Sequence, residues 1–136
     1  MDHGKYSKSF KINDREPVEI NPIDAENRGL KDGDIVKLFN NRGACLAGVK
    51  IEKKVMQGVA QISTGAWYDP QNPMEHGSIC KHGNPNILTR DKGTSKLGQG
   101  PIAHSCLVEM EKYNDKPPKV TAHEPPVIIR LDESLN

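Results

Sequence analysis

Short strand patterns separated by turn signals constrain the fold of this chain more than any other feature. The patterns lie at residues 17–20, 35–39, 44–51, 59–63 and 102–110. In the second of them, apolar Val36 and Leu38 alternate with Lys37, which is typical of a half-buried strand. Residues 40–43, NNRG, are a hairpin signal between two such strands. Strands at this spacing predict a mainly β fold, a small barrel with one or two short helices.

One short helix is expected between the first two strands. Asn21 is a favourable N-cap, and Pro22 suits the first helical position because proline lacks the amide hydrogen that would be unpaired there. Gly29 is suited to ending the helix, because glycine readily adopts the left-handed conformation. The helix should therefore be about two turns long.

The chain is predicted to be one domain with three parts. Its 136 residues fall within the usual size of a single domain with a real core. Residues 1–15 show little periodicity, and we expect an irregular lead-in that can be the remainder of a truncated upstream strand. Residues 16–112 should form the barrel, and the proline-rich residues 113–136 an extended tail over its surface.

Charge and cysteine content exclude several classes of partner. The net charge is +1 with no run of five like charges, so no nucleic-acid footprint or membrane-surface contact is expected. No apolar run has the length of a membrane span, and no secretory leader opens the chain. Three irregularly spaced cysteines fit a reducing compartment better than a disulfide framework.

A polar stretch, residues 80–100, stands between segments that look like ordinary strands. It reads CKHGNPNILTRDKGTSKLGQG. Its glycines allow a backbone to approach a ligand closely, and its amide and hydroxyl side chains offer both donors and acceptors. A polar ligand with heterocyclic edges or phosphate oxygens would explain this composition. A long surface loop explains it as well.

A zinc site is one alternative interpretation of the same region. Cys80 and His82 are two residues apart, as are His104 and Cys106, so each pair would project from one side of a strand. The four side chains would then stabilise an interaction module. Zinc modules usually place more residues between paired ligands, and buried cysteine is common in cores, so the spacing favours a structural role.

Self-processing is a second alternative. Cleavage before Ser78, in the sequence EHGSIC, would generate a pyruvoyl group of the kind found in some small β-barrel enzymes. A single Gly-Ser pair is too common to indicate this chemistry by itself. No phosphate-binding loop or nucleophile elbow is present, so the motifs identify no catalytic residues in this chain.

Three separated blocks carry a resemblance to a known family. They are residues 16–43, EPVEINPIDAENRGLKDGDIVKLFNNRG, residues 58–70, GVAQISTGAWYDP, and the polar stretch 80–100. In this order and spacing they resemble the C-terminal molybdopterin-dinucleotide-binding domain of the DMSO reductase family. The branch most similar contains trimethylamine-N-oxide reductase and biotin sulfoxide reductase. The resemblance runs from about residue 6 into the proline-rich tail.

The resemblance implies a double-psi β-barrel, also described as an aspartate-decarboxylase-like barrel, that binds part of a bis(molybdopterin guanine dinucleotide) cofactor carrying molybdenum or tungsten. Asn86, in an N-x-L-T motif, and Gln99, at the end of the same block, are the implied main contacts. The implied weaker contacts are His82, Gly83, Thr94, Ser95, Trp67 and Tyr68. Amide side chains suit pterin and guanine edges because they donate and accept at once.

The resemblance also implies partners. Related enzymes are several times longer and hold their metal-ligating and substrate residues elsewhere, so this chain alone is not expected to catalyse the oxygen-atom transfer that reduces N-oxides or S-oxides. Its partners would be the remaining domains or a large subunit. Relatives have a further strand upstream, and its absence would leave an unpaired edge through which the chain can dimerise. The compartment, periplasmic or cytoplasmic, is left open.

Overall fold

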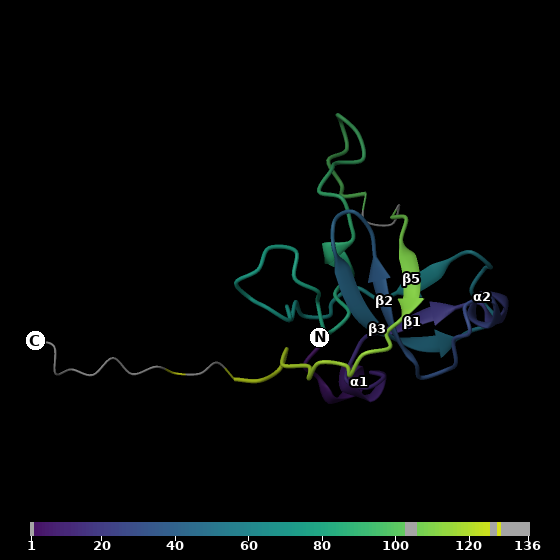
Figure 1. Cartoon of the computed structure of the whole chain (residues 1–136). Helices are drawn as coiled ribbons and strands as arrows, with labels where there is room; N and C mark the ends of the chain where they lie inside the picture. The colour runs from purple at the N-terminus through teal and green to yellow at the C-terminus, as the bar shows by residue number, and fades with distance from the viewer. Residues whose placement is uncertain (1, 103–105, 126–127, 129–136) are drawn as a thin grey trace, which may run out of the picture.

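The computed structural model describes residues 2–102, 106–125 and 128. The elements follow in the order α1 (Lys5–Ser9), β1 (Pro17–Ile20), α2 (Pro22–Asn27), β2 (Ile35–Phe39), β3 (Ala44–Ile51), β4 (Ala60–Ile62), the 3-10 helix η1 (Pro85–Ile87) and β5 (Glu109–Lys112). The five strands form one curved sheet, with α2 at one end and α1 below it (Figure 1). The fold is therefore mainly β, as predicted.

The sheet is mixed, with the strand order β4-β1-β3-β2-β5. β1 lies parallel to β3, so the chain must cross over between them, and it does so through α2 and β2. All other neighbouring strands are antiparallel, including the predicted hairpin of β2 and β3. β4 and β5 are the two edges of the sheet.

The predicted helix is confirmed as α2. The Asn21 side chain accepts a hydrogen bond from the amide of Ile23 at 2.9 Å, as an N-cap does. Gly29 has φ of +62° and ends the helix, while the amide of Leu30 donates back to the carbonyl of Ala25.

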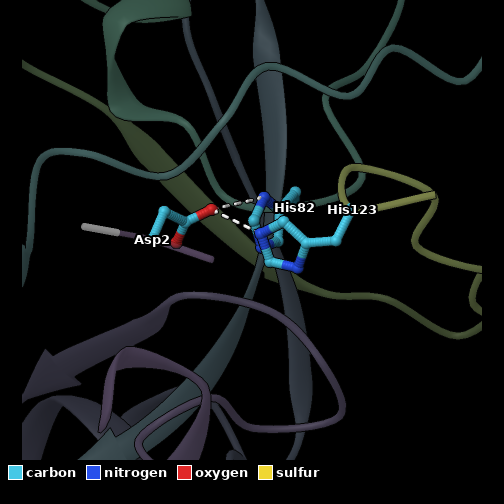
Figure 2. A group of neighbouring side chains, drawn as sticks. All are labelled: Asp2, His82 and His123. Atoms are coloured by element: carbon cyan, nitrogen blue, oxygen red, sulfur yellow. Dashed lines mark hydrogen bonds and ion pairs between the residues drawn. The ribbon is translucent and has the colours of Figure 1, made fainter. Parts of the chain in front are cut away.

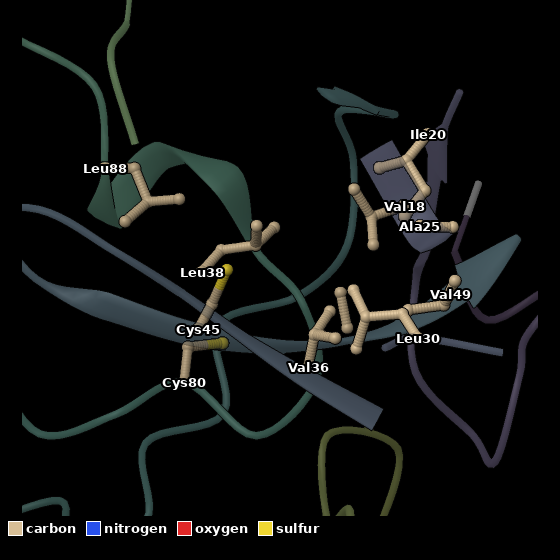
Figure 3. Packing of buried hydrophobic residues seen from close by; sticks show 11 residues of the cluster. Val18, Ile20, Ala25, Leu30, Val36, Leu38, Cys45, Val49, Cys80 and Leu88 are labelled. Atoms are coloured by element: carbon tan, nitrogen blue, oxygen red, sulfur yellow. The ribbon is translucent and has the colours of Figure 1, made fainter. Parts of the chain in front are cut away.

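The core lies against one face of the sheet and is built from strand side chains, Ala25 of α2 and the loop residues Leu30, Cys80 and Leu88 (Figure 3). Val36 and Leu38 are both buried, as their alternation predicted. In β3 every residue from 45 to 49 is buried, which means that both faces of this central strand are covered. On the second face Ile12 lies directly over Gly48, where a Cβ atom would come within 2.3 Å of the Ile12 Cβ. The segment before β1 is therefore part of the packing.

Two expectations about local structure were wrong. The lead-in is not irregular throughout, because residues 5–9 form α1, and the rings of Tyr6 and Phe10 meet edge to face at 4.9 Å across one helical turn. The last strand begins at Glu109, and residues 106–108 precede it without strand pairing. The reason is that the partner strand β2 ends at Phe39, which pairs with Glu109, so residues 106–108 have no strand neighbour there; the Asn40 side chain donates to the carbonyl of Leu107 instead. Residues 103–105 of the expected strand lie outside the described residues.

The described part of the tail follows β5 across the molecule toward the N-terminus (Figure 1). The guanidinium of Arg15 donates to the carbonyl of Pro118. The amide and hydroxyl of Thr121 both donate to the buried carboxylate of Asp69 at 2.7 Å. Among the residues that the structure describes, no helix has the length and apolar character needed to cross a bilayer.

Candidate functional site

The structure distributes the eight predicted contact residues over three places. Tyr68 and Asn86 line one cavity. Thr94, Ser95 and Gln99 belong to the exposed loop 91–101. Trp67, His82 and Gly83 lie on the side of the molecule where the N-terminus and the tail meet. Each place is built differently.

The cavity has a volume of about 540 Å³ and opens beside η1. Its wall carries the amides of Asn84 and Asn86, the phenol of Tyr68 and the guanidinium of Arg42. Asn84 caps η1, since its side chain accepts from the amide of Asn86 at 2.9 Å. Asn86 itself is exposed, and its side-chain amide bonds to none of the described residues. An amide held on a capped turn and left unpaired is positioned to bind a polar ligand.

The 84–89 turn, which contains η1, is held firmly by the β2–β3 hairpin. Arg42 Nε donates to the carbonyl of Leu88 at 2.7 Å, and Asn40 donates to the same oxygen at 2.9 Å. Gly43 packs closely under the turn, where a Cβ atom would come within 2.5 Å of the Ile87 side chain. These contacts fix the position of Asn86 relative to the sheet.

The 91–101 loop is held mainly by bonds within itself. The amide of Thr94 donates to the carbonyl of Gly100 at 2.8 Å, and the amide of Gly98 donates to the Ser95 hydroxyl at 2.8 Å. Gln99 Nε2 donates to the carbonyls of Ser95 and Lys96 at 3.2 and 3.1 Å. The loop projects from the sheet (Figure 1), and its polar side chains are exposed. The Gln99 amide nitrogen is therefore already used within the loop.

His82 is fully buried and faces a carboxylate that sequence reasoning missed. Its Nδ1 donates to the carbonyl of Trp67 at 3.1 Å and lies 3.6 Å from Asp2 Oδ2. His123, from the tail, donates through Nε2 to the same oxygen at 2.9 Å (Figure 2). The half-exposed Trp67 ring meets His123 edge to face at 5.2 Å. Because these residues are far apart in the sequence, no local pattern indicated that they meet.

Burial and charge shift the titration of this cluster. Burial opposes ionisation of Asp2, but hydrogen bonds from Lys11, His123 and the Trp67 amide outweigh it, and the pKa of Asp2 falls to about 2. Burial lowers the pKa of His82, despite the nearby Trp67 carbonyl and Asp2. At neutral pH Asp2 is therefore charged and His82 is neutral.

Gly83 has a structural reason to be glycine. Its φ is +89°, and a Cβ atom there would come within 2.8 Å of the Glu16 Cβ and 3.2 Å of the Leu46 carbonyl. This packing accounts for the residue type without a ligand. A contact between Gly83 and a cofactor stays a prediction, as do the contacts of the other seven residues.

The structure does not bring together the three predicted zinc ligands that it describes, Cys80, His82 and Cys106. Cys80 is buried beside Cys45 in the core, whereas the thiol of Cys106 donates to the carbonyl of Leu88. Among the described residues, the one group of three or more metal-ligating side chains is Asp2, His82 and His123. His104 lies outside the described residues.

Ser78 also has a structural partner. Its buried hydroxyl accepts a hydrogen bond from the amide of Asn72 at 2.8 Å, and its own amide donates to the carbonyl of Glu75. These bonds close the turn that precedes Cys80. Cleavage before Ser78 stays an untested alternative.

Comparison with known proteins points to one family. A family model described as molydopterin dinucleotide binding domain matches residues 2–107. The chain is 50% identical over 114 residues to trimethylamine-N-oxide reductase 1 of Escherichia coli (strain K12), covering 84% of this chain and 13% of that protein. It is 44% identical over 125 residues to the trimethylamine-N-oxide reductase of Haemophilus influenzae, covering 91% of this chain and 15% of that protein.

A solved structure is similar in fold. Acetylene hydratase from Pelobacter acetylenicus superimposes with a TM-score of 0.56 and 17% sequence identity, over 72% of this chain and 14% of that one. At this identity the likeness concerns the fold alone. In each comparison the chain spans only about a seventh of the matched protein.

Proposed function

Because the chain belongs to the molydopterin dinucleotide binding domain family, we propose that it holds part of a bis(molybdopterin guanine dinucleotide) cofactor as the C-terminal domain of a molybdenum oxidoreductase. The cavity beside η1 supports this proposal most directly, because it presents the unpaired amide of Asn86 on a fixed turn. We also propose that the curved mixed sheet is a double-psi β-barrel of the aspartate-decarboxylase-like type.

The side chains around the cavity suit the chemistry of such a cofactor. Pterin and guanine edges alternate donors and acceptors, and the unpaired amide of Asn86 can both donate to them and accept from them. Asn84, whose side-chain oxygen caps η1, can add a donor. Arg42 adds a positive charge to the lining that would attract a pyrophosphate, while Glu75 on the same lining partly offsets it. The half-exposed ring of Tyr68 offers an aromatic face. Gln99, with Thr94 and Ser95, would add contacts from the 91–101 loop.

The metal of the bound cofactor, molybdenum or tungsten, would supply the oxygen-atom transfer chemistry. The contribution of this chain is to bind and orient the organic part, as proteins do for cofactors that carry the reaction themselves. The names of the similar proteins suggest an N-oxide as the substrate, with S-oxides as the related alternative. The substrate site would lie in other domains or a large subunit.

A free sheet edge offers a second kind of contact. β4 pairs with β1 on one side, and no described strand pairs with its other side. In the isolated chain, this edge can pair with a second copy, giving a dimer. Sedimentation equilibrium tests this: a mass that rises toward twice 15.0 kDa with concentration supports the dimer, and a constant monomer mass contradicts it.

The decisive experiment for the cofactor role replaces Asn86 in an intact enzyme that carries this domain. Asn86→Ala should lower the content of molybdenum and of releasable guanine nucleotide in the purified enzyme, because it removes an amide that can both donate hydrogen bonds to the cofactor and accept them from it. Asn114→Ala is a matched control, since Asn114 is an exposed amide in the tail, away from the cavity. Full cofactor occupancy in Asn86→Ala would remove Asn86 from the site.

Titration of the isolated chain with released molybdopterin guanine dinucleotide complements this test. Amide shifts around Asn86 in NMR spectra would mean that the domain binds the cofactor by itself. A well-folded sample without shifts would mean that binding needs the other domains closed over the cavity.

A further inference from the structure

We propose that Asp2, His82 and His123 form a binding site for a transition-metal ion of the Zn²⁺ type, separate from the cavity beside η1. Each residue offers one ligand atom, and the three atoms lie within 4.8 Å of one another. Figure 2 shows both imidazole rings turned toward the same carboxylate. The residues come from the N-terminus, the polar stretch and the tail, so a bound ion would link all three.

Two of the three distances between these atoms bracket the value expected for a tetrahedral site. Asp2 Oδ2 lies 2.9 Å from His123 Nε2 and 3.6 Å from His82 Nδ1. A tetrahedral zinc ion with bonds of about 2.0–2.1 Å places its ligand atoms about 3.3 Å apart, between these two values. The carbonyl oxygen of Trp67, 3.1 Å from His82 Nδ1, borders the same space. Water or this oxygen can take the fourth position.

Burial and ligand type favour a metal of this class. The side chains of Asp2 and His82 are 3% and 0% exposed, so they are already ordered, and His123 is 17% exposed and leaves a path of entry. Imidazole nitrogens suit zinc, cobalt, nickel and copper, whereas magnesium prefers oxygen ligands and keeps much of its water.

Two features of the cluster limit the affinity. Lys11 places its ammonium 2.5 Å from Asp2 Oδ1, so it repels a cation bound at the other oxygen, although Glu16 partly neutralises it.

The ligand atoms are also hydrogen-bonded in the free chain. His82 Nδ1 donates to the Trp67 carbonyl and His123 Nε2 donates to Asp2, so metal binding would move both protons to the other ring nitrogens. Of these, His82 Nε2 is buried and has no partner among the described residues. The Trp67 amide also donates to Asp2 Oδ2 and would compete with the ion for that oxygen. We therefore expect micromolar binding.

The test is calorimetric titration of the metal-free 136-residue chain with Zn²⁺, with Co²⁺ absorption as a second readout. We expect one ion per chain, the absorption of tetrahedral cobalt, and no binding of Mg²⁺. His123→Ala should weaken binding about tenfold or more. His76→Ala, which removes an exposed histidine elsewhere, and Cys106→Ser, which removes a half-buried thiol, should leave the affinity unchanged.

Lys11→Gln supplies a variant with the opposite expected effect, because removing the competing ammonium should tighten binding. Circular dichroism checks that His123→Ala and Lys11→Gln remain folded, as expected for residues outside the hydrophobic core. The proposal is overturned by the absence of saturable binding of one ion, by unchanged affinity in His123→Ala, or by unchanged or weaker affinity in Lys11→Gln.

Discussion

The 84–89 turn and the 91–101 loop belong to the same polar stretch but are held in opposite ways. Arg42 and Asn40 of the β2–β3 hairpin bind the turn, and the amide of Asn86 remains unpaired toward solvent. The loop is closed by its own backbone and by Gln99, whose amide nitrogen is already bonded. Two segments of similar composition therefore differ in what they offer a ligand. The turn is held by the hairpin and leaves the Asn86 amide unpaired, whereas the loop must rearrange before the Gln99 amide nitrogen can bind a ligand.

The largest expected effect is at Gly83, which directly precedes the 84–89 turn. Gly83→Ala should lower the free energy of unfolding by about 3 kcal/mol, because φ is +89° and the added Cβ would meet Glu16. Chemical denaturation measures the change. Gly98→Ala in the loop is the matched control, since its nearest neighbour would lie at an ordinary 3.5 Å. If both variants lost the same free energy of unfolding, the expected difference in packing between the turn and the loop would be contradicted.

The hydrogen bonds between hairpin and turn should have the next largest effect. Arg42→Ala should destabilise the chain by about 1–2 kcal/mol, because the carbonyl of Leu88 loses one of its partners. Amide hydrogen exchange in residues 84–89 should also become faster, because the turn loses this contact to the hairpin. Arg90→Ala, an exposed arginine just beyond the turn, is the control and should change neither quantity.

High pH should also destabilise the β2–β3 hairpin, through ionisation of the Cys45 thiol. Burial, and to a smaller degree Cys80, raise the pKa of the Cys45 thiol from 9.0 to about 12. The unfolded chain thus loses this proton first, so stability is fully present well below pH 9 and decreases as the pH rises toward 12, by about 1.4 kcal/mol at pH 10. Denaturation at pH 8 and 10 measures the loss. If Cys45→Ala loses as much stability over this range, the assignment to Cys45 is wrong.

The smallest effect is expected in the loop. Gln99→Ala should change the global free energy of unfolding by less than about 0.5 kcal/mol, because the loop is exposed and contributes nothing to the core. Hydrogen exchange at residues 95–98 should become faster, since the Gln99 side chain no longer joins the carbonyls of Ser95 and Lys96. Asn86→Ala should leave exchange in both regions unchanged. Slower or unchanged loop exchange in Gln99→Ala would mean that the loop does not depend on this side chain.

Local patterns were most successful where neighbouring residues decide the structure. The alternation of Val36 and Leu38 predicted β2, and Asn21 with Pro22 predicted the start of α2. The short α1 was missed because one turn of helix has almost no periodicity, although the spacing of Tyr6 and Phe10 was a usable signal. The last strand was predicted too long because its apolar pattern does not reveal that the partner strand ends at Phe39, opposite Glu109.

The sequence by itself determined the β character, the capped helix, the hairpin and, through three separated blocks, the family to which the chain belongs. Only the tertiary structure decided which polar side chains remain available. Asn86 is unpaired and Gln99 is bonded, though both are amides in the same polar stretch. Likewise Asp2, His82 and His123 meet only through folding. Hydrogen bonding and burial between residues this far apart depend on how strands and tail cross in space, which no local pattern encodes.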